Sequence, residues 1–230
     1  WAVLYPENIE GYITSTVESK PLSLKGKVDY RAAKLVEYQG QALADRYRKF
    51  VSQFEDEALQ EAVALSYHKL LAYKDEYEVA RLLLSTQEKA EAAFDGDFKM
   101  SYHMSPPLPA KMGANGRPMK RQFGPGMKRW LKLLAKMKGL RGTAFDVFGR
   151  TAERKMERAL IVQFEQDMGE VLNGLSQQSL PTAIALAELP MSIRGFGPVK
   201  SENEAKAAKA RESLLAEFRA GGAPVVEAAE

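Results

Sequence analysis

The sequence predicts a mainly α-helical domain of about seven helices, with at most a small strand or hairpin near residues 98–104. Over most of the chain, apolar residues recur at alternating spacings of three and four, which is the period of one buried helix face. Only one stretch alternates with the period of two that is typical of a half-buried strand. The 230 residues are 45% hydrophobic, so the chain can bury a substantial core.

Three regions are expected along the chain. Residues 1–27 are predicted to be a linker or a strap on another surface, because they lack sustained periodicity and contain Pro6, Gly11, Pro21 and Gly26. The helical domain is expected to span 28–219, and 220–230 to form a flexible tail.

The first part of the domain is predicted to be an antiparallel pair of long helices. Asp29 can cap the first helix, and one face of it would carry Val36, Gly40, Leu43, Tyr47, Phe50 and Phe54. The second helix would bury Leu59, Val63, Tyr67 and Leu70. Residues 75–94 are expected to form one or two shorter helices, broken around Ser85.

A strand and a long loop are predicted next. In FKMSYHM, apolar and polar residues alternate from Phe98 to Met104, which favours a half-buried strand that needs a partner. Residues 105–126 are predicted to be a loop, because it is rich in proline and glycine. Loops of that length are uncommon unless they are functional or mobile.

The C-terminal part is expected to hold the remaining helices. The first, starting at Pro125, would have an apolar stripe of Met127, Trp130, Leu131, Leu134 and Met137. Thr151 can cap a long helix that ends near Gly174, and 179–189 would form a short apolar helix or turn. Ser201 and Glu204 have the spacing of a capping box for the last helix.

Composition excludes several classes of function. The chain has no cysteine, so it can hold neither a disulfide nor a cysteine-ligated iron-sulfur cluster. No apolar run approaches the roughly 20 residues that cross a bilayer, and no secretion signal is evident, so a cytoplasmic location without membrane contact is expected. Because the chain starts at Trp1 and not at Met, we expect a piece of a longer polypeptide.

Charged and histidine residues offer few catalytic candidates. His68 and His103 are too few and too far apart in sequence to indicate a metal site, so no metal is expected. The charges of YKDEYEVAR are interpreted first as a solvated helix face with internal ion pairs. Secondary candidates for a site are Lys74, Glu76, Arg81, His103, Arg154, Arg158 and Arg194.

A basic block is the strongest charge feature. From Phe98 to Phe145 there are eleven Lys or Arg and no Asp or Glu, whereas the rest of the chain has 22 bases against 30 acids. Either acids from other segments fold over the block, or it meets an anion or an acidic partner. The candidates for docking are Lys120, Arg121, Lys128, Arg129, Lys132 and Arg141.

Several stretches together resemble a known family. They are YHKLLAYKDEYEVARLL (67–83), KMSYHMSPPL (99–108), KRQFGPGM (120–127), KGLRGTAFDVFGRTAERKMERALI (138–161) and IRGFGPVK (193–200). In this order they are similar to the C-terminal region of the fused indolepyruvate ferredoxin oxidoreductases, relatives of the 2-oxoacid:ferredoxin oxidoreductases. The resemblance covers roughly residues 60–215.

The resemblance implies a parent enzyme whose chemistry lies elsewhere. Such an enzyme decarboxylates an aryl 2-oxoacid on thiamine diphosphate, passes electrons through iron-sulfur clusters to ferredoxin and releases an acyl-CoA. The family's cofactor motifs belong to its other domains, so no catalytic residue carries over and no cofactor is expected in this segment. We expect a non-catalytic helical domain that packs on those domains in a homo-oligomer.

Three functional hypotheses remain open. In the first, this domain serves assembly or docks CoA or ferredoxin through the basic block. In the second, it is a free-standing anion-binding module, with nucleic acid disfavoured because the block has few aromatic residues. In the third, it is an independent enzyme that uses the KDE stretch, His103 and Arg141, which requires them to converge in one pocket.

Overall fold

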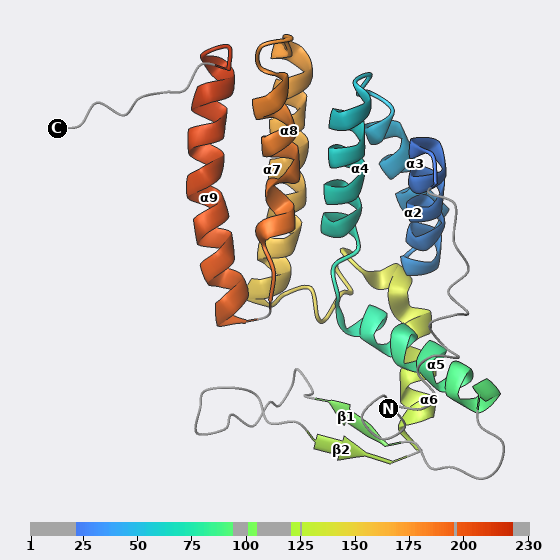
Figure 1. Cartoon of the computed structure of the whole chain (residues 1–230). Helices are drawn as coiled ribbons and strands as arrows, with labels where there is room; N and C mark the ends of the chain where they lie inside the picture. Colours follow the sequence, from blue (N-terminus) through green and yellow to red (C-terminus); the bar gives the residue numbers. More distant parts are fainter. Residues whose placement is uncertain (1–21, 94–100, 105–120, 125, 196, 223–230) are drawn as a thin grey trace, which may run out of the picture.

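The protein is an array of helices with a smaller helical layer and a short hairpin at one end (Figure 1). The computed structural model describes residues 22–93, 101–104, 121–124, 126–195 and 197–222. Its α-helices are α2 (Leu24–Tyr38), α3 (Gln41–Val51), α4 (Glu57–Leu71), α5 (Glu76–Ala93), α6 (Met127–Lys136), α7 (Ala152–Gly174), α8 (Leu180–Glu188) and α9 (Pro198–Arg219). Two 3-10 helices, η2 (Met137–Leu140) and η3 (Leu189–Ser192), follow α6 and α8. The mainly α prediction is confirmed.

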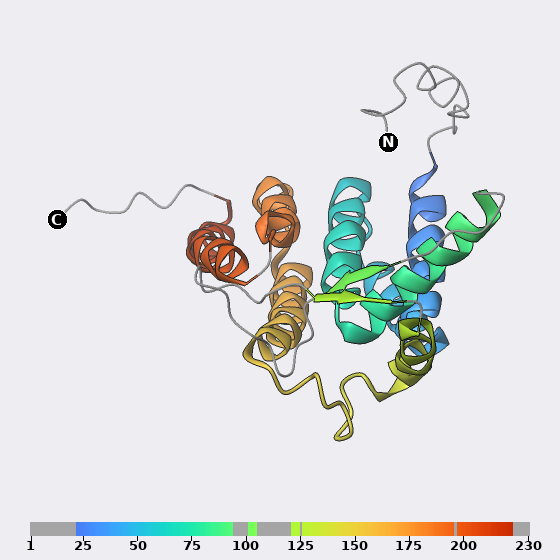
Figure 2. The same ribbon diagram turned by 90° about the horizontal axis from the view of Figure 1, so that it is seen from below.

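The larger core lies between six of these helices. Apolar side chains from α2, α3, α4, α7, α8 and α9 form one buried cluster, and α4 lies in the middle of the array (Figures 1 and 2). Tyr47, Tyr67 and Phe164 pack there, with the Tyr67 ring centroid 6.1 Å from that of Tyr47 and 5.9 Å from that of Phe164. The predicted buried face of the second helix is confirmed, since Leu59, Val63, Tyr67 and Leu70 are all buried in α4.

The first predicted helix is in fact two helices. Gly40 has a φ of 154°, a backbone conformation that residues with a side chain rarely adopt, and it interrupts the helix between α2 and α3. The apolar period continues across this break, so periodicity alone could not reveal it. Helix α2 also starts earlier than expected: Ser23 Oγ accepts from the Gly26 amide at 3.2 Å, whereas Asp29 is exposed. The predicted boundary at 27/28 therefore falls inside α2.

The smaller core belongs to α5, α6 and the hairpin. Ala80, Tyr102 and Leu131 form its centre, with Leu84 and Leu134 packed against them. Helix α5 runs through Ser85 without the expected break. Strand β1 (Tyr102–Met104) confirms part of the predicted strand, while Phe98 to Met100 lie outside the described residues.

The partner strand lies inside the predicted loop. Strand β2 (Arg121–Phe123) pairs antiparallel with β1, with Tyr102 opposite Phe123. Residues 105–120 lie outside the described residues. The loop prediction is therefore wrong at 121–123. The sequence pattern did not reveal this strand, because three residues are too few to show alternation.

The last three α-helices start where their caps and prolines place them. Thr151 Oγ1 accepts from the Arg154 amide at 3.3 Å, which confirms the predicted cap of α7. Helix α8 confirms the short helix expected at 179–189. Helix α9, however, starts at Pro198, so the predicted capping box at Ser201 is wrong. No helix among the described residues is long and apolar enough to cross a membrane.

Candidate functional site

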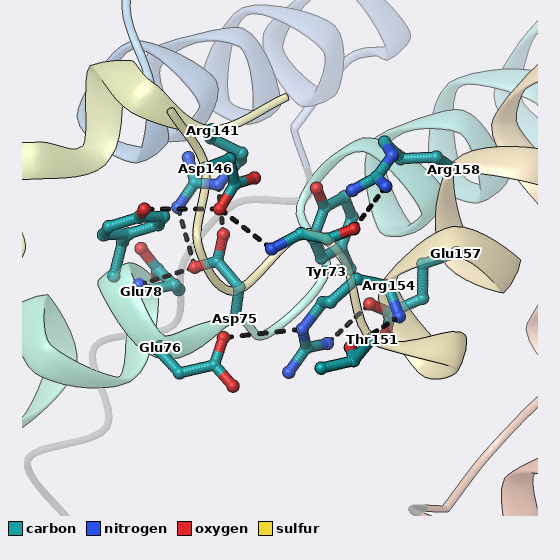
Figure 3. A network of polar contacts seen from close by, with 12 residues as sticks. Tyr73, Asp75, Glu76, Glu78, Arg141, Asp146, Thr151, Arg154, Glu157 and Arg158 are labelled. Atoms are coloured by element: carbon teal, nitrogen blue, oxygen red, sulfur yellow. Dashed lines mark hydrogen bonds and ion pairs between the residues drawn. The ribbon is translucent and has the colours of Figure 1, made fainter. Parts of the chain in front are cut away.

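The junction between α4 and α5 is the start of a buried polar network (Figure 3). Asp75 is only 3% exposed and caps α5, because its Oδ1 accepts from the Glu78 amide at 2.8 Å. Glu78 is also buried and accepts from Arg81 on both of its oxygens. The interpretation of this stretch as a solvated face is therefore wrong for Asp75 and Glu78.

Arg141 closes the network from the other side. Its guanidinium donates to both oxygens of Asp75, through Nε and, at 2.9 Å, through Nη2. Its Nη1 donates to the Tyr38 carbonyl at 3.0 Å, and its Cζ lies 3.6 Å from the centre of the Tyr38 ring. Because Arg141 is 6% exposed and fully paired, the prediction that it docks an anion or a partner is wrong. Its charge is used inside the fold.

Asp146 organises the loop between Arg141 and α7. Its carboxylate accepts from the amides of Gly142 and Gly149, each at 2.9 Å, and from the Tyr77 hydroxyl at 3.3 Å. Burial, and then the charge of Asp146, raise the pKa of Tyr77 to about 12, so the hydroxyl keeps its proton and donates. A Cβ on Gly149 would lie 2.4 Å from Asp146 Oδ2, so any larger residue would displace the carboxylate.

A second group of charges joins the starts of α5, α7 and α9. Glu157 is 5% exposed and accepts at 2.5 Å from Arg154 Nη1 and at 2.5 Å from Lys200 Nζ. Arg154 Nε also lies 3.6 Å from Glu76 Oε2. Glu76 belongs to α5, Arg154 and Glu157 belong to α7, and Lys200 belongs to α9, so their pairing links three helices.

Two members of the network are incompletely satisfied: Glu76, whose Oε2 is buried without a hydrogen-bond partner in the described chain, and Arg158. The Nη2 of Arg158 donates to the Gly149 carbonyl at 2.5 Å, and its Nη1 is buried without a hydrogen-bond partner among the described residues. Burial also raises the pKa of the neighbouring Tyr73 hydroxyl. Burial thus keeps the Tyr73 and Tyr77 hydroxyls protonated.

The geometry of this network favours a structural role over catalysis. Asp75, Asp146 and Glu157 each accept at least two hydrogen bonds. Within the described ranges, no group of three His, Asp or Glu side chains could hold a metal ion. A cavity of about 30 Å³ lies elsewhere, lined mainly by apolar side chains of α4, α7, α8, η3 and α9. None of the residues that line this cavity belongs to the network.

The remaining docking candidates lie on or near α6. Lys128 is paired with Glu91 at 2.8 Å, while Arg129 and Lys132 are exposed and have no ion pair within the described ranges. Within the predicted apolar stripe, Leu131 is buried as expected, whereas Trp130 is 69% exposed, so the prediction is wrong for Trp130. Lys120 and the side chain of Arg121 lie outside what the structure describes.

The secondary candidates are scattered. Lys74 and Arg194 are exposed, and Arg194 Nε donates to the Met191 carbonyl at 3.0 Å. Arg81 links Glu78 to Glu37. Only Glu76, Arg154 and Arg158 belong to the network; His103 lies in β1, with its side chain outside the described part of the chain.

Sequence reasoning missed three residues that complete the network: Tyr38, Asp146 and Lys200. Asp146 alone had a local signal, since an Asp three residues before a Gly is typical of a turn in which the carboxylate accepts from the glycine amide. The others are identified only by partners that are distant in sequence.

Comparison with known proteins gives one match. A family model described as a family of unknown function, DUF6537, matches residues 24–213. No curated protein and no solved structure matches the chain. The matched range includes the whole polar network and α6.

Proposed function

We propose that this protein, which belongs to the family of unknown function DUF6537, is a non-catalytic helical domain that holds a larger enzyme together. The observation that carries the proposal is the internal pairing of the buried network around Asp75, Asp146 and Glu157. Its carboxylates are occupied by internal donors from segments far apart in sequence, as at Asp75 and Arg141. Such groups fix helices in place and are not free to transfer protons to a substrate.

The parent enzyme in this proposal is a thiamine diphosphate-dependent indolepyruvate, or aryl 2-oxoacid, ferredoxin oxidoreductase. Support comes from the resemblance of 67–83 and 138–161 to that family, because these two stretches supply Asp75 and Arg141. Thiamine diphosphate and the iron-sulfur clusters would lie in other domains. The same proposal includes a cytoplasmic, homo-oligomeric parent in which this domain contacts its neighbours.

The domain's second task in this proposal is to dock an anionic reactant, CoA or ferredoxin. Support comes from the exposed cations of α6, which have no ion pair within the described ranges. In the full enzyme, reversing Lys128, Arg129 and Lys132 to Glu should raise the Michaelis constant for ferredoxin or CoA at low salt. Unchanged kinetics would contradict this docking role.

The assembly role has a separate test. Thiamine diphosphate and cysteine-cluster motifs in the polypeptide that precedes Trp1 would identify the parent. In that enzyme, Arg141→Met should lower the yield of assembled oligomer, because an unpaired buried Asp75 loosens the junction of α4 and α5. Turnover per assembled enzyme should stay unchanged; a loss of turnover in fully assembled enzyme would instead indicate catalysis.

An alternative is a free-standing module that binds anions or nucleic acid. The observation that favours it is the exposed Trp130 beside Arg129 and Lys132, since aromatic and basic side chains together bind single strands. A salt-dependent mobility shift with RNA or DNA would support this alternative. No shift at low salt would leave the assembly role ahead.

A further inference from the structure

Helix α6 has two faces of different character. One face packs into the smaller core through Leu131 and Leu134. The opposite face is solvent-exposed, and we name it the α6 face: Arg129, Trp130, Lys132, Leu133 and Lys136. Spacings of three and four residues place Arg129, Lys132, Leu133 and Lys136 on one side of the helix, and Trp130, three residues before Leu133, lies at the edge of this side.

The cations of the α6 face have no acid to neutralise them. None of Arg129, Lys132 and Lys136 forms an ion pair with another described residue. Glu91, the carboxylate that the charge of Lys132 also reaches, is already paired with Lys128 at 2.8 Å. The segment from Phe98 to Phe145 contains no Asp or Glu. Among the described residues, the face is therefore positively charged without an ion-paired acid.

The same face exposes two large apolar side chains. Trp130 is 69% exposed and Leu133 is 52% exposed, one helical turn apart. Tryptophan and arginine are the residues that most often supply binding energy at protein interfaces. A tryptophan flanked by cations needs a partner that is both acidic and locally apolar.

We propose that the α6 face is a docking surface for an acidic protein segment whose carboxylates face Arg129, Lys132 and Lys136 and whose apolar side chains cover Trp130 and Leu133. The inference deepens the docking part of the proposed function and rests on it only for the identity of the parent enzyme. It commits to a protein as the occupant. A helix surface that exposes leucine and tryptophan offers an apolar contact that a phosphate does not use, and the cavity described above is lined by residues outside α6.

Trp130 itself can report the docking. The chain has two tryptophans, so the Trp1→Phe variant leaves Trp130 as the sole one. The probe is a synthetic helical peptide of glutamate and leucine, titrated into the whole protein while emission and acrylamide quenching are recorded. Covering the indole should shift emission to shorter wavelength and reduce quenching. Salt at about 0.5 M should weaken binding severalfold, because exposed charges are screened.

Two variants and one matched control locate the surface. Arg129→Glu, Lys132→Glu and Lys136→Glu together should weaken peptide binding by at least about tenfold. Trp130→Ala should weaken peptide binding about tenfold. Calorimetry measures the affinity of this variant, because it lacks the indole. The control reverses three exposed lysines elsewhere, Lys49, Lys155 and Lys209, and should keep the affinity within about twofold because they lie outside the α6 face. Circular dichroism verifies that each variant is folded.

Other outcomes would overturn the inference. An equal loss of binding in the control would mean that net charge alone attracts the peptide, as would equal affinity for a glutamate–serine peptide. Tighter binding of CoA, or of single-stranded oligothymidylate, would assign the face to phosphates. A blue shift and a doubled mass without peptide would assign it to a second copy. Because the titration needs no parent enzyme, its failure is separate from a failure to find oxidoreductase motifs.

Discussion

Arg141 and Arg154 differ from the cations of the α6 face in burial and in ion pairing, although the two groups lie close together in sequence. Arg141 and Arg154 point inward and donate to Asp75 and Glu157. Arg129 and Lys132 point to solvent and have no ion pair among described residues. The difference lies in the available acids: the first set faces the acidic 75–78 stretch and α7, while the second faces only Glu91, which is taken by Lys128. These cations thus divide into a structural set, Arg141 and Arg154, and a free set on the α6 face.

Among the substitutions that test this comparison, removal of the paired cation Arg141 should have the largest effect on stability. Arg141→Met leaves Asp75 buried without its partner and should lower the free energy of unfolding by about 3–5 kcal/mol. Urea denaturation followed by circular dichroism measures it. Lys74→Met, one residue from Asp75 but exposed, is the control and should change little. A loss below about 1 kcal/mol would show that the pair adds little to stability.

A smaller effect is expected from crowding the turn around Asp146. Gly149→Ala would place a Cβ 2.4 Å from Asp146 Oδ2 and should cost about 2–3 kcal/mol, because the carboxylate must move from its donors. Thermal unfolding checks this. Gly139→Ala has open space around its Cβ and should be neutral or slightly stabilising. Equal melting temperatures for the two variants would contradict the packing described for Asp146.

The burial of His68 predicts a pH dependence of stability that can be tested. Burial lowers the pKa of His68 from 6.5 to about 4, and its Nε2 has no hydrogen-bond partner in the described chain. The unfolded chain therefore binds the proton first, and stability is lost as the pH falls below about 6.5. Between about pH 7 and pH 5 the loss should be about 2 kcal/mol. Urea titrations of His68→Gln should show a flatter pH dependence; an identical slope would exclude His68 as the cause.

The smallest effect on the free energy of unfolding should come from substitutions in the free set, the cations of the α6 face. Replacing Arg129, Lys132 and Lys136 together by Met should change the free energy of unfolding by no more than about 1 kcal/mol, because these charges have no ion pair to lose among described residues. The same urea assay measures it beside Arg141→Met. A loss as large as that of Arg141→Met would show that the α6 face is also structural, and the contrast between the two sets would disappear.

Sequence periodicity determined the parts of the fold that depend on near neighbours. The buried face of α4, the Thr151 cap of α7 and the short helix α8 follow from spacings within a few residues. The predicted strand near 98–104 likewise follows from local alternation, which holds in β1. Local pattern also placed the positive charge on α6, but not the direction in which each side chain points.

Tertiary structure decided which charges are buried and which are free. Arg141 was grouped with Lys132 by sequence, yet its partner Asp75 lies 66 residues away and becomes visible only when α5 meets the loop before α7. Trp130 and Leu131 fit the same apolar stripe, and only packing against α5 selects Leu131 for burial. Which side of a helix is buried depends on the element that packs against it, and these ion pairs join segments that are distant in sequence. The sequence therefore determined which charges are present, and the tertiary arrangement determined which of them are paired.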